Sequence, residues 1–148
     1  MRLSLGLYGL QDWFGGDFGA VVDLIRVADR KGVDQVSITD HVVMGERVDR
    51  YPFGTFPSLL DYPWYEPITV LAAIAGATER IRLSTGILIS PLRPAILLAK
   101  QLATLDVMSR GRVEIGIGTG WQREEYEACG IDFDKRYRIM DEQVRVCR

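Results

Sequence analysis

The chain contains few of the residues that build disulfide frameworks and metal centres. It has two cysteines, Cys129 and Cys147, and one histidine, His41. The cysteines form no CxxC motif, so the sequence predicts reduced thiols in a cytoplasmic protein. A metal ion at the single histidine would have to take its other ligands from carboxylates, and we therefore predict no metal site.

An excess of charge of one sign and a long hydrophobic run are also missing. The formal net charge is −2 and the basic residues form no cluster, which argues against a nucleic-acid partner. No apolar stretch approaches the ~20 residues of a membrane span, and glycines interrupt the apolar N-terminus, so we expect neither a membrane segment nor a signal peptide. A length of 148 residues, 47% of them hydrophobic and 26% charged, is typical of one globular domain over residues 1–148.

The chain does contain a regular alternation of strand and helix signals. Apolar segments predict strands at residues 3–8, 34–39, 81–89 and 113–117. Helix starts are marked by three residues, Asp17, Pro67 and Pro94. This order predicts a parallel sheet with covering helices, either a doubly wound open sheet or part of a (β/α)8 barrel.

Helical spacing also predicts which faces are buried. The helix after Pro67 should bury Leu71, Ile74, Ala75 and Thr78, and the next helix should bury Leu98, Leu102, Leu105 and Met108. A terminal helix is expected to be capped by Asp134, and its buried stripe is expected to consist of Tyr137, Met140, Val144 and Cys147.

In both architectures ligands bind where the carboxyl ends of the strands meet. That rule brings Asp40 and His41 together with residues 86–90 and 116–121. Residues 116–121 read GIGTGW, and alternate glycines before a helix allow backbone amides to approach a bound group. The spacing matches neither a dinucleotide fingerprint nor a P-loop, so a tight turn without a ligand is an equal alternative.

The connection at residues 40–66 is far longer than the usual 2–6 residues of such units. It is rich in rings and prolines, namely Tyr51, Pro52, Phe53, Phe56, Pro57, Tyr62, Pro63, Trp64 and Tyr65. We expect it either to wall a pocket for a flat, apolar ligand or simply to fold over the end of the sheet.

Several stretches resemble the bacterial luciferase-like family of flavin and deazaflavin oxidoreductases. They are SITDH at residues 37–41, the segment 80–136 with its GWxxEE pattern, and RIMDEQVRV at residues 138–146. Segment 80–136 is most similar to a subgroup described as probable deazaflavin-dependent oxidoreductases. The resemblance implies an α/β fold of the (β/α)8 TIM-barrel family, of which this chain holds the first four βα units as a half barrel. It implies coenzyme F420, a deazaflavin, as cofactor, with FMN as the alternative.

The same resemblance implies catalytic residues. His41 matches a histidine that lies against the reactive ring, where an imidazole is suited to handling a proton, and the adjacent Asp40 is the second candidate. The alternative is that Asp40 caps a turn and His41 packs under the aromatic rings. Glu124 and Glu125 are expected to stabilise a helix start. Arg136 is expected either to pair with one of them or to contact a ligand phosphate.

Two segments are expected to bind the cofactor. Thr85, Gly86 and Ile87 match a segment that bulges behind the ring, in some family members through a cis peptide bond. The alternative is that Gly86 makes room for a covering helix. The other segment lies beside the cofactor after the fourth strand and consists of Gly118, Thr119, Gly120 and Trp121.

The leading hypothesis for function is hydride transfer between a carbon of a small-molecule substrate and F420. An FMN-dependent monooxygenase that uses reduced flavin and oxygen is the close alternative. A hydrolase or isomerase with a metal on Asp40 and His41, and a non-catalytic half barrel that binds no cofactor, are alternatives of other classes. We expect the half barrel to be covered, by a second copy in a homo-oligomer or by the missing C-terminal half.

Overall fold

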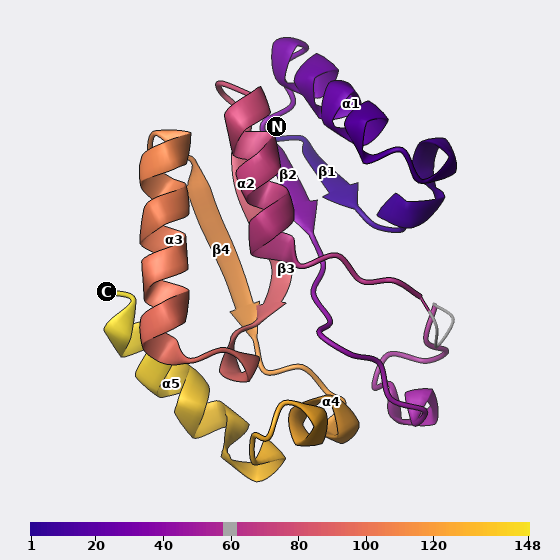
Figure 1. Cartoon of the computed structure of the whole chain (residues 1–148), viewed down its shortest axis with the longest axis vertical. Helices are drawn as coiled ribbons and strands as arrows, with labels where there is room; N and C mark the ends of the chain where they lie inside the picture. The colour runs from indigo at the N-terminus through magenta and orange to yellow at the C-terminus, as the bar shows by residue number, and fades with distance from the viewer. Residues whose placement is uncertain (58–61) are drawn as a thin grey trace.

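The four predicted strands form one parallel sheet. The computed structural model describes residues 1–57 and 62–148, apart from the side chain of Gln11. The strands pair in the order β1-β2-β3-β4 and are β1 (Ser4–Leu7), β2 (Gln35–Ile38), β3 (Arg82–Ile89) and β4 (Val113–Gly118). A doubly wound sheet reverses its strand order at a switch point, whereas this order is that of successive strands in a (β/α)8 barrel. The predicted half-barrel architecture is therefore confirmed (Figure 1).

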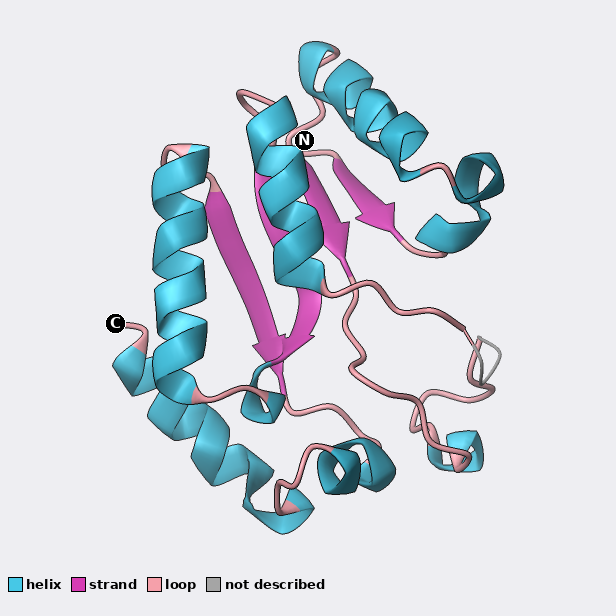
Figure 2. Ribbon diagram, in the orientation of Figure 1, coloured by secondary structure: helices cyan, strands magenta, loops and turns pink. Residues whose placement is uncertain are grey.

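Three helices cover one face of the sheet. They are α1 (Phe18–Arg30), α2 (Pro67–Ala77) and α3 (Ala95–Ser109), and Figure 2 shows them on the same side of the strands. The predicted starts are confirmed, since the Asp17 carboxylate accepts from the backbone N–H groups of Gly19 and Ala20, and Pro67 occupies the first turn of α2. Shorter 3-10 helices are η1 (Leu10–Gly16), η2 (Val48–Arg50), η3 (Ser90–Leu92) and η4 (Phe133–Lys135).

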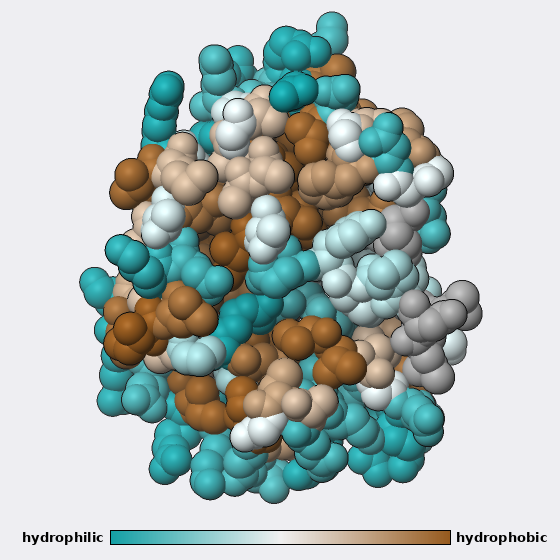
Figure 3. Space-filling model, in the orientation of Figure 1, coloured by the Kyte–Doolittle hydropathy of each residue, from teal (hydrophilic) through white to brown (hydrophobic). Residues whose placement is uncertain are grey.

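The hydrophobic core lies between the sheet and these helices. The four residues predicted for the inner face of α2 are all buried, and they face apolar strand side chains such as Val36 and Leu83. On α3, Leu98 and Leu105 are buried as predicted, but Met108 is 57% exposed, so that part of the prediction is wrong. On the face of the molecule seen in Figure 3, hydrophobic side chains are interspersed with hydrophilic ones.

Buried polar contacts join the elements at the edge of the sheet where β3 and β4 begin. The Asp29 carboxylate accepts from the backbone N–H groups of Glu79, Arg80 and Ile81, which ties the end of α1 to the start of β3. Burial alone favours the neutral acid, but these N–H groups outweigh it and lower the pKa of Asp29. Arg112 donates to four backbone carbonyl groups and to one hydroxyl group. This edge lies opposite the carboxyl ends of the strands and serves stability.

Helices α4 (Arg123–Ala128) and α5 (Arg136–Val146) follow β4. The predicted cap of the terminal helix is wrong, because no side chain caps α5 and Asp134 pairs with Arg123 at 2.8 Å. Its predicted stripe is also partly wrong, since Tyr137 and Cys147 are exposed. The buried residue of α5 is Gln143, whose amide donates to the carbonyl groups of two residues around η3, namely Ser90 and Arg93. A polar side chain thus docks α5, which a search for apolar spacing does not detect.

Candidate active site

A cavity of about 440 Å³ lies at the carboxyl ends of the strands. Eight of the nine predicted site residues line it, namely Asp40, His41, Gly86, Ile87, Gly118, Thr119, Gly120 and Trp121. Thr85 does not line the cavity. Its side chain is buried, and its hydroxyl donates to the carbonyl of Gly116 at 2.7 Å, which ties β3 to β4. The chain therefore brings together residues at or near the carboxyl ends of three strands, β2, β3 and β4, as the carboxyl-end rule predicts.

Strand β3 is irregular where it borders the cavity, as predicted. The peptide bond Gly86-Ile87 is cis, and the register between β3 and β4 shifts between Thr85 and Leu88. The Ile87 side chain is 39% exposed and forms part of the cavity wall. The cis bond and the register shift confirm the predicted bulge, which a regular strand would have contradicted.

The alternate glycines of β4 make room for this irregular strand. A Cβ atom at Gly116 would lie 2.5 Å from the carbonyl oxygen of Thr85, and one at Gly118 would lie 2.8 Å from Cδ1 of Ile87. Gly120 has φ +63° and would approach Ile89 to 3.0 Å. The glycine pattern in the sequence therefore has a packing cause in addition to lining the cavity.

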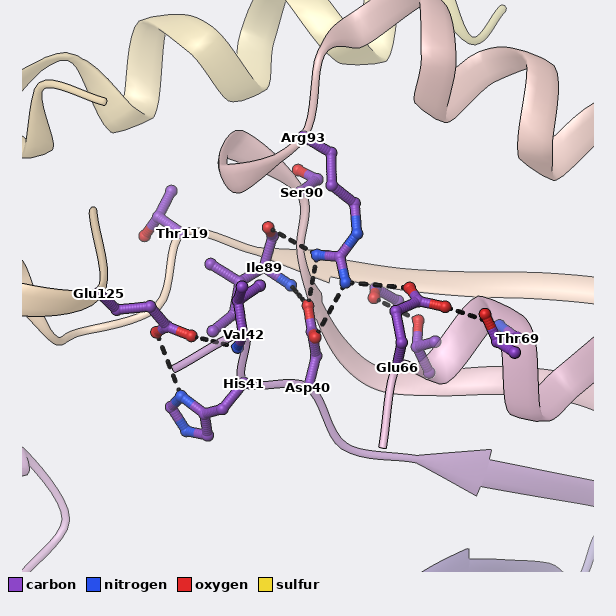
Figure 4. A network of polar contacts seen from close by, with 12 residues as sticks. Asp40, His41, Val42, Glu66, Thr69, Ile89, Ser90, Arg93, Thr119 and Glu125 are labelled. Atoms are coloured by element: carbon purple, nitrogen blue, oxygen red, sulfur yellow. Dashed lines mark hydrogen bonds and ion pairs between the residues drawn. The ribbon is translucent and has the colours of Figure 1, made fainter. Parts of the chain in front are cut away.

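The carboxylate beside His41 comes from α4. Nδ1 of His41 lies 3.1 Å from Oε2 of Glu125, whose side chain is completely buried, and the backbone N–H of Val42 donates to Oε1 at 2.6 Å (Figure 4). Glu125 lies in the first turn of α4, as expected for a residue that stabilises a helix start, but both of its oxygens also bind the segment after β2. The sequence contained the GWxxEE pattern but gave no sign of this partner.

Asp40 has partners other than His41. Its buried carboxylate accepts from the backbone N–H of Ile89 at 2.8 Å and from both terminal nitrogens of Arg93 at 2.7 and 3.0 Å (Figure 4). Arg93 also reaches Glu66, which caps α2 by accepting from the N–H of Thr69. Burial lowers the pKa of an arginine, but these two carboxylates outweigh it and raise the pKa of Arg93. Asp40 therefore joins three segments around the cavity.

The start of α4 also holds the long connection. The amide of Gln122 is buried, accepts from the N–H of Gly45 and donates to its carbonyl, each at 2.9 Å. A Cβ atom at Gly45 would lie 2.6 Å from Cβ of Glu124, so the close approach requires glycine there. Together with Glu125, these contacts fix residues 41–45 against α4.

Aromatic rings of the connection form the outer wall of the cavity. Tyr51 lies 5.2 Å from Phe56 and 5.3 Å from Trp121 between ring centroids, and Phe56 lies 5.5 Å from Trp121. His41 lies 4.7 Å from the ring of Trp64. The interpretation of the connection as a pocket wall is confirmed for these rings, whereas residues 58–61 lie outside the described residues.

The rest of the connection contributes to a smaller space. Tyr62 and Tyr65 line a separate cavity of about 20 Å³ together with Trp64.

No lysine or arginine is present among the described residues that line the 440 Å³ cavity. The guanidinium of Arg136 lies 3.8 Å from the ring centroid of Phe133 and donates to that residue's carbonyl. Within residues 1–57 and 62–148, Arg136 pairs with no glutamate of α4, and it does not line the 440 Å³ cavity. Within residues 1–57 and 62–148, no group of three or more His, Cys, Asp and Glu side chains could hold a metal ion. No helix in the same residues is long and apolar enough to cross a membrane.

The sequence profile of the family described as "Luciferase-like monooxygenase" matches residues 6–148. The chain belongs to the luciferase-like monooxygenase family. Among curated relatives, this member is 31% identical over 136 residues to an uncharacterized protein of Mycobacterium tuberculosis, covering 89% of this chain and 47% of the relative. It is 37% identical over 87 residues to the FMNH(2)-dependent dimethylsulfone monooxygenase of Pseudomonas putida, covering 57% of this chain and 24% of the relative.

Solved structures give the same family and fold. Monooxygenase RslO1 from Streptomyces bottropensis superposes with a TM-score of 0.77 at 27% identity, over 99% of this chain and 42% of that protein. The coenzyme F420-dependent tetrahydromethanopterin reductase from Methanopyrus kandleri superposes with a TM-score of 0.58 at 25% identity, over 89% of this chain and 30% of that protein. The luciferase-like chain described here thus spans about half the length, or less, of the relatives it matches.

Proposed function

We propose that this chain forms half of the active site of an oxidoreductase that transfers a hydride between a substrate carbon and the deazaflavin coenzyme F420. The observation that carries the proposal is the 440 Å³ cavity in which His41, the irregular β3 segment and the glycine segment after β4 converge. Its volume falls in the range of about 300–1,000 Å³ of small-molecule sites.

The residues of the cavity fit a flat tricyclic ring. Ile87 offers an apolar side chain on one wall, and Trp121 offers a ring on another. Between them, the backbone of Gly118 and Gly120 and the Thr119 hydroxyl offer polar groups to the ring edge. Tyr126 of α4 supports residues 118–120, because its buried hydroxyl donates to the carbonyl of Thr119.

His41 is the proposed proton-handling residue, and it is the only histidine in the chain. When bound, a deazaflavin supplies the carbon that accepts or gives the hydride, while the protein supplies orientation and proton transfer. Asp40 is proposed to act by position, since its carboxylate holds Ile89 and Arg93 at the cavity edge.

The choice of F420 over FMN rests on the likeness of residues 80–136 to the probable deazaflavin-dependent subgroup, and the F420-dependent reductase among the structural neighbours supports it. The second candidate is an FMN-dependent monooxygenase, which is favoured by the 37% identity to the FMNH(2)-dependent enzyme of Pseudomonas putida. Both would use the same cavity.

Cofactor titration of the purified 148-residue chain tests the proposal. We expect F420 to bind at least about tenfold more tightly than FMN, measured by fluorescence, with no oxygen consumption by the reduced complex. Trp121→Ala should weaken binding about tenfold, whereas Tyr137→Ala, at an exposed ring outside the cavity, should not.

Tighter binding of FMN with oxygen consumption would support the monooxygenase instead. Binding of neither cofactor, by the chain alone or by a protein that also contains the second half of the barrel, would refute both functions and favour the non-catalytic half barrel.

A further inference from the structure

His41 is held by the carboxylate of Glu125, a side chain that is completely buried. Glu125 lies 84 residues further along the chain, and its side chain is 0% exposed. Oε1 accepts from the Val42 N–H at 2.6 Å, and Oε2 faces Nδ1 of His41 at 3.1 Å (Figure 4). Asp40 does not compete for the imidazole, because Ile89 and Arg93 occupy its carboxylate.

This arrangement determines which ring nitrogen carries the proton. An ionised carboxylate has acceptors only, so a hydrogen bond between Glu125 and His41 requires the proton to be on Nδ1. In neutral His41 the lone pair is then on Nε2. Within residues 1–57 and 62–148, Nε2 has no hydrogen-bond partner, and the His41 ring lines the cavity. The nitrogen offered to a ligand is therefore Nε2.

We propose that Glu125 is a positioning residue that fixes the Nδ1–H tautomer of neutral His41 and so makes Nε2 the atom that takes up a proton in the cavity. The use of that proton in a reaction rests on the proposed function, whereas the tautomer does not. Gln122 supports the same arrangement, because its two contacts with Gly45 hold the segment that carries His41 against the start of α4.

Nitrogen-15 NMR of histidine-labelled protein tests the tautomer directly, and the single histidine makes the assignment unambiguous. At a pH where His41 is neutral, long-range proton–nitrogen correlations should show the Nδ1–H form in excess by at least about tenfold. Glu125→Gln should reverse the pattern. If the amide oxygen keeps the Val42 contact, the amide nitrogen faces Nδ1 and donates to it, which places the proton on Nε2. A reversed tautomer is known to disable the histidine of a serine-protease triad.

Glu124→Gln is the matched control. It removes a neighbouring carboxylate that does not contact His41, so the wild-type pattern should persist. A wild-type spectrum dominated by Nε2–H, or a Glu125→Gln spectrum identical to that of wild type, would overturn the proposal. If Glu125→Gln fails to fold, the wild-type tautomer still decides.

An enzymatic measurement adds a functional test. In the cofactor-loaded enzyme, Glu125→Gln should lower kcat about 10²- to 10⁴-fold, the usual range for a lost proton-transfer group, and change the cofactor Kd less than about threefold. An unchanged kcat would refute the positioning role. Failure of both cofactors to bind would refute the proposed function, but the NMR result would be unaffected, so the two failures are distinguishable.

Discussion

Arg93 offers the sharpest stability test of the site. The side chains of Asp40 and Arg93 are 1% and 11% exposed, and Arg93 supplies two of the three hydrogen bonds that the Asp40 carboxylate accepts. Arg93→Met keeps most of the side-chain volume but leaves a buried carboxylate with the Ile89 N–H as its remaining donor. Uncompensated buried charges of this kind cost about 3–5 kcal/mol. That is a large part of the roughly 5–15 kcal/mol that stabilises a typical domain.

A second change should recover part of this loss. In Asp40→Asn with Arg93→Met the buried group is a neutral amide, so the double variant should be more stable than Arg93→Met alone, by about 2 kcal/mol. Asp40→Asn by itself should be destabilising, because a charged hydrogen-bond acceptor of Arg93 is lost. The pair therefore predicts a strongly non-additive double-mutant cycle.

Urea unfolding of the four proteins measures these free energies. Arg47→Met is the control, since Arg47 also makes a two-point contact with a carboxylate, Asp49, but on the exposed surface, where little change is expected. Additive effects within about 0.5 kcal/mol, or equal effects of Arg93→Met and Arg47→Met, would refute the account of Asp40 as a buried structural anchor.

Three further predictions concern other parts of the fold. Because the folded-state pKa of Asp29 is lowered, its contribution is complete above the unfolded value of about 3.9 and is lost as pH falls through the folded value. The destabilisation by Asp29→Asn should therefore shrink below about pH 4 in urea titrations, and a constant difference, or the same trend in the exposed Asp141→Asn, would contradict this. Gly118→Ala should lower the free energy of unfolding by about 1–3 kcal/mol, because the added Cβ would lie 2.8 Å from Cδ1 of Ile87 in β3. Gly76→Ala, in open space within α2, should raise it by up to about 1 kcal/mol. Equal shifts of the melting temperature in the two variants would count against the packing role of Gly118. Arg112→Lys should lower the free energy of unfolding by about 2 kcal/mol or more, because a lysine cannot reproduce the planar guanidinium that donates to several carbonyl groups. An unchanged unfolding midpoint would exclude a stabilising role for these hydrogen bonds.

The sequence by itself predicted a parallel sheet with covering helices and the edge of the sheet that carries the site, and it left a doubly wound sheet and a barrel as alternatives. Local signals suffice for this, because apolar periodicity, the Asp17 cap and the prolines Pro67 and Pro94 act over one or two helical turns. The rule for parallel strands then placed His41 near the carboxyl ends of β3 and β4 without any knowledge of contacts. Where the signal was polar, as for Gln143 on α5, the local pattern failed.

The tertiary structure decided the partners of these residues. His41 is hydrogen-bonded to Glu125 rather than to its neighbour Asp40, and Asp40 is hydrogen-bonded to Arg93, 53 residues away. Strand register and the path of the long connection set such pairings, and neither is encoded in a short window of sequence. The same holds for Gly118, which the sequence presents as a ligand contact and the fold also uses to admit the Ile87 side chain. The sequence therefore indicated which residue types form the site, but the geometry of the site depends on how distant segments pack together.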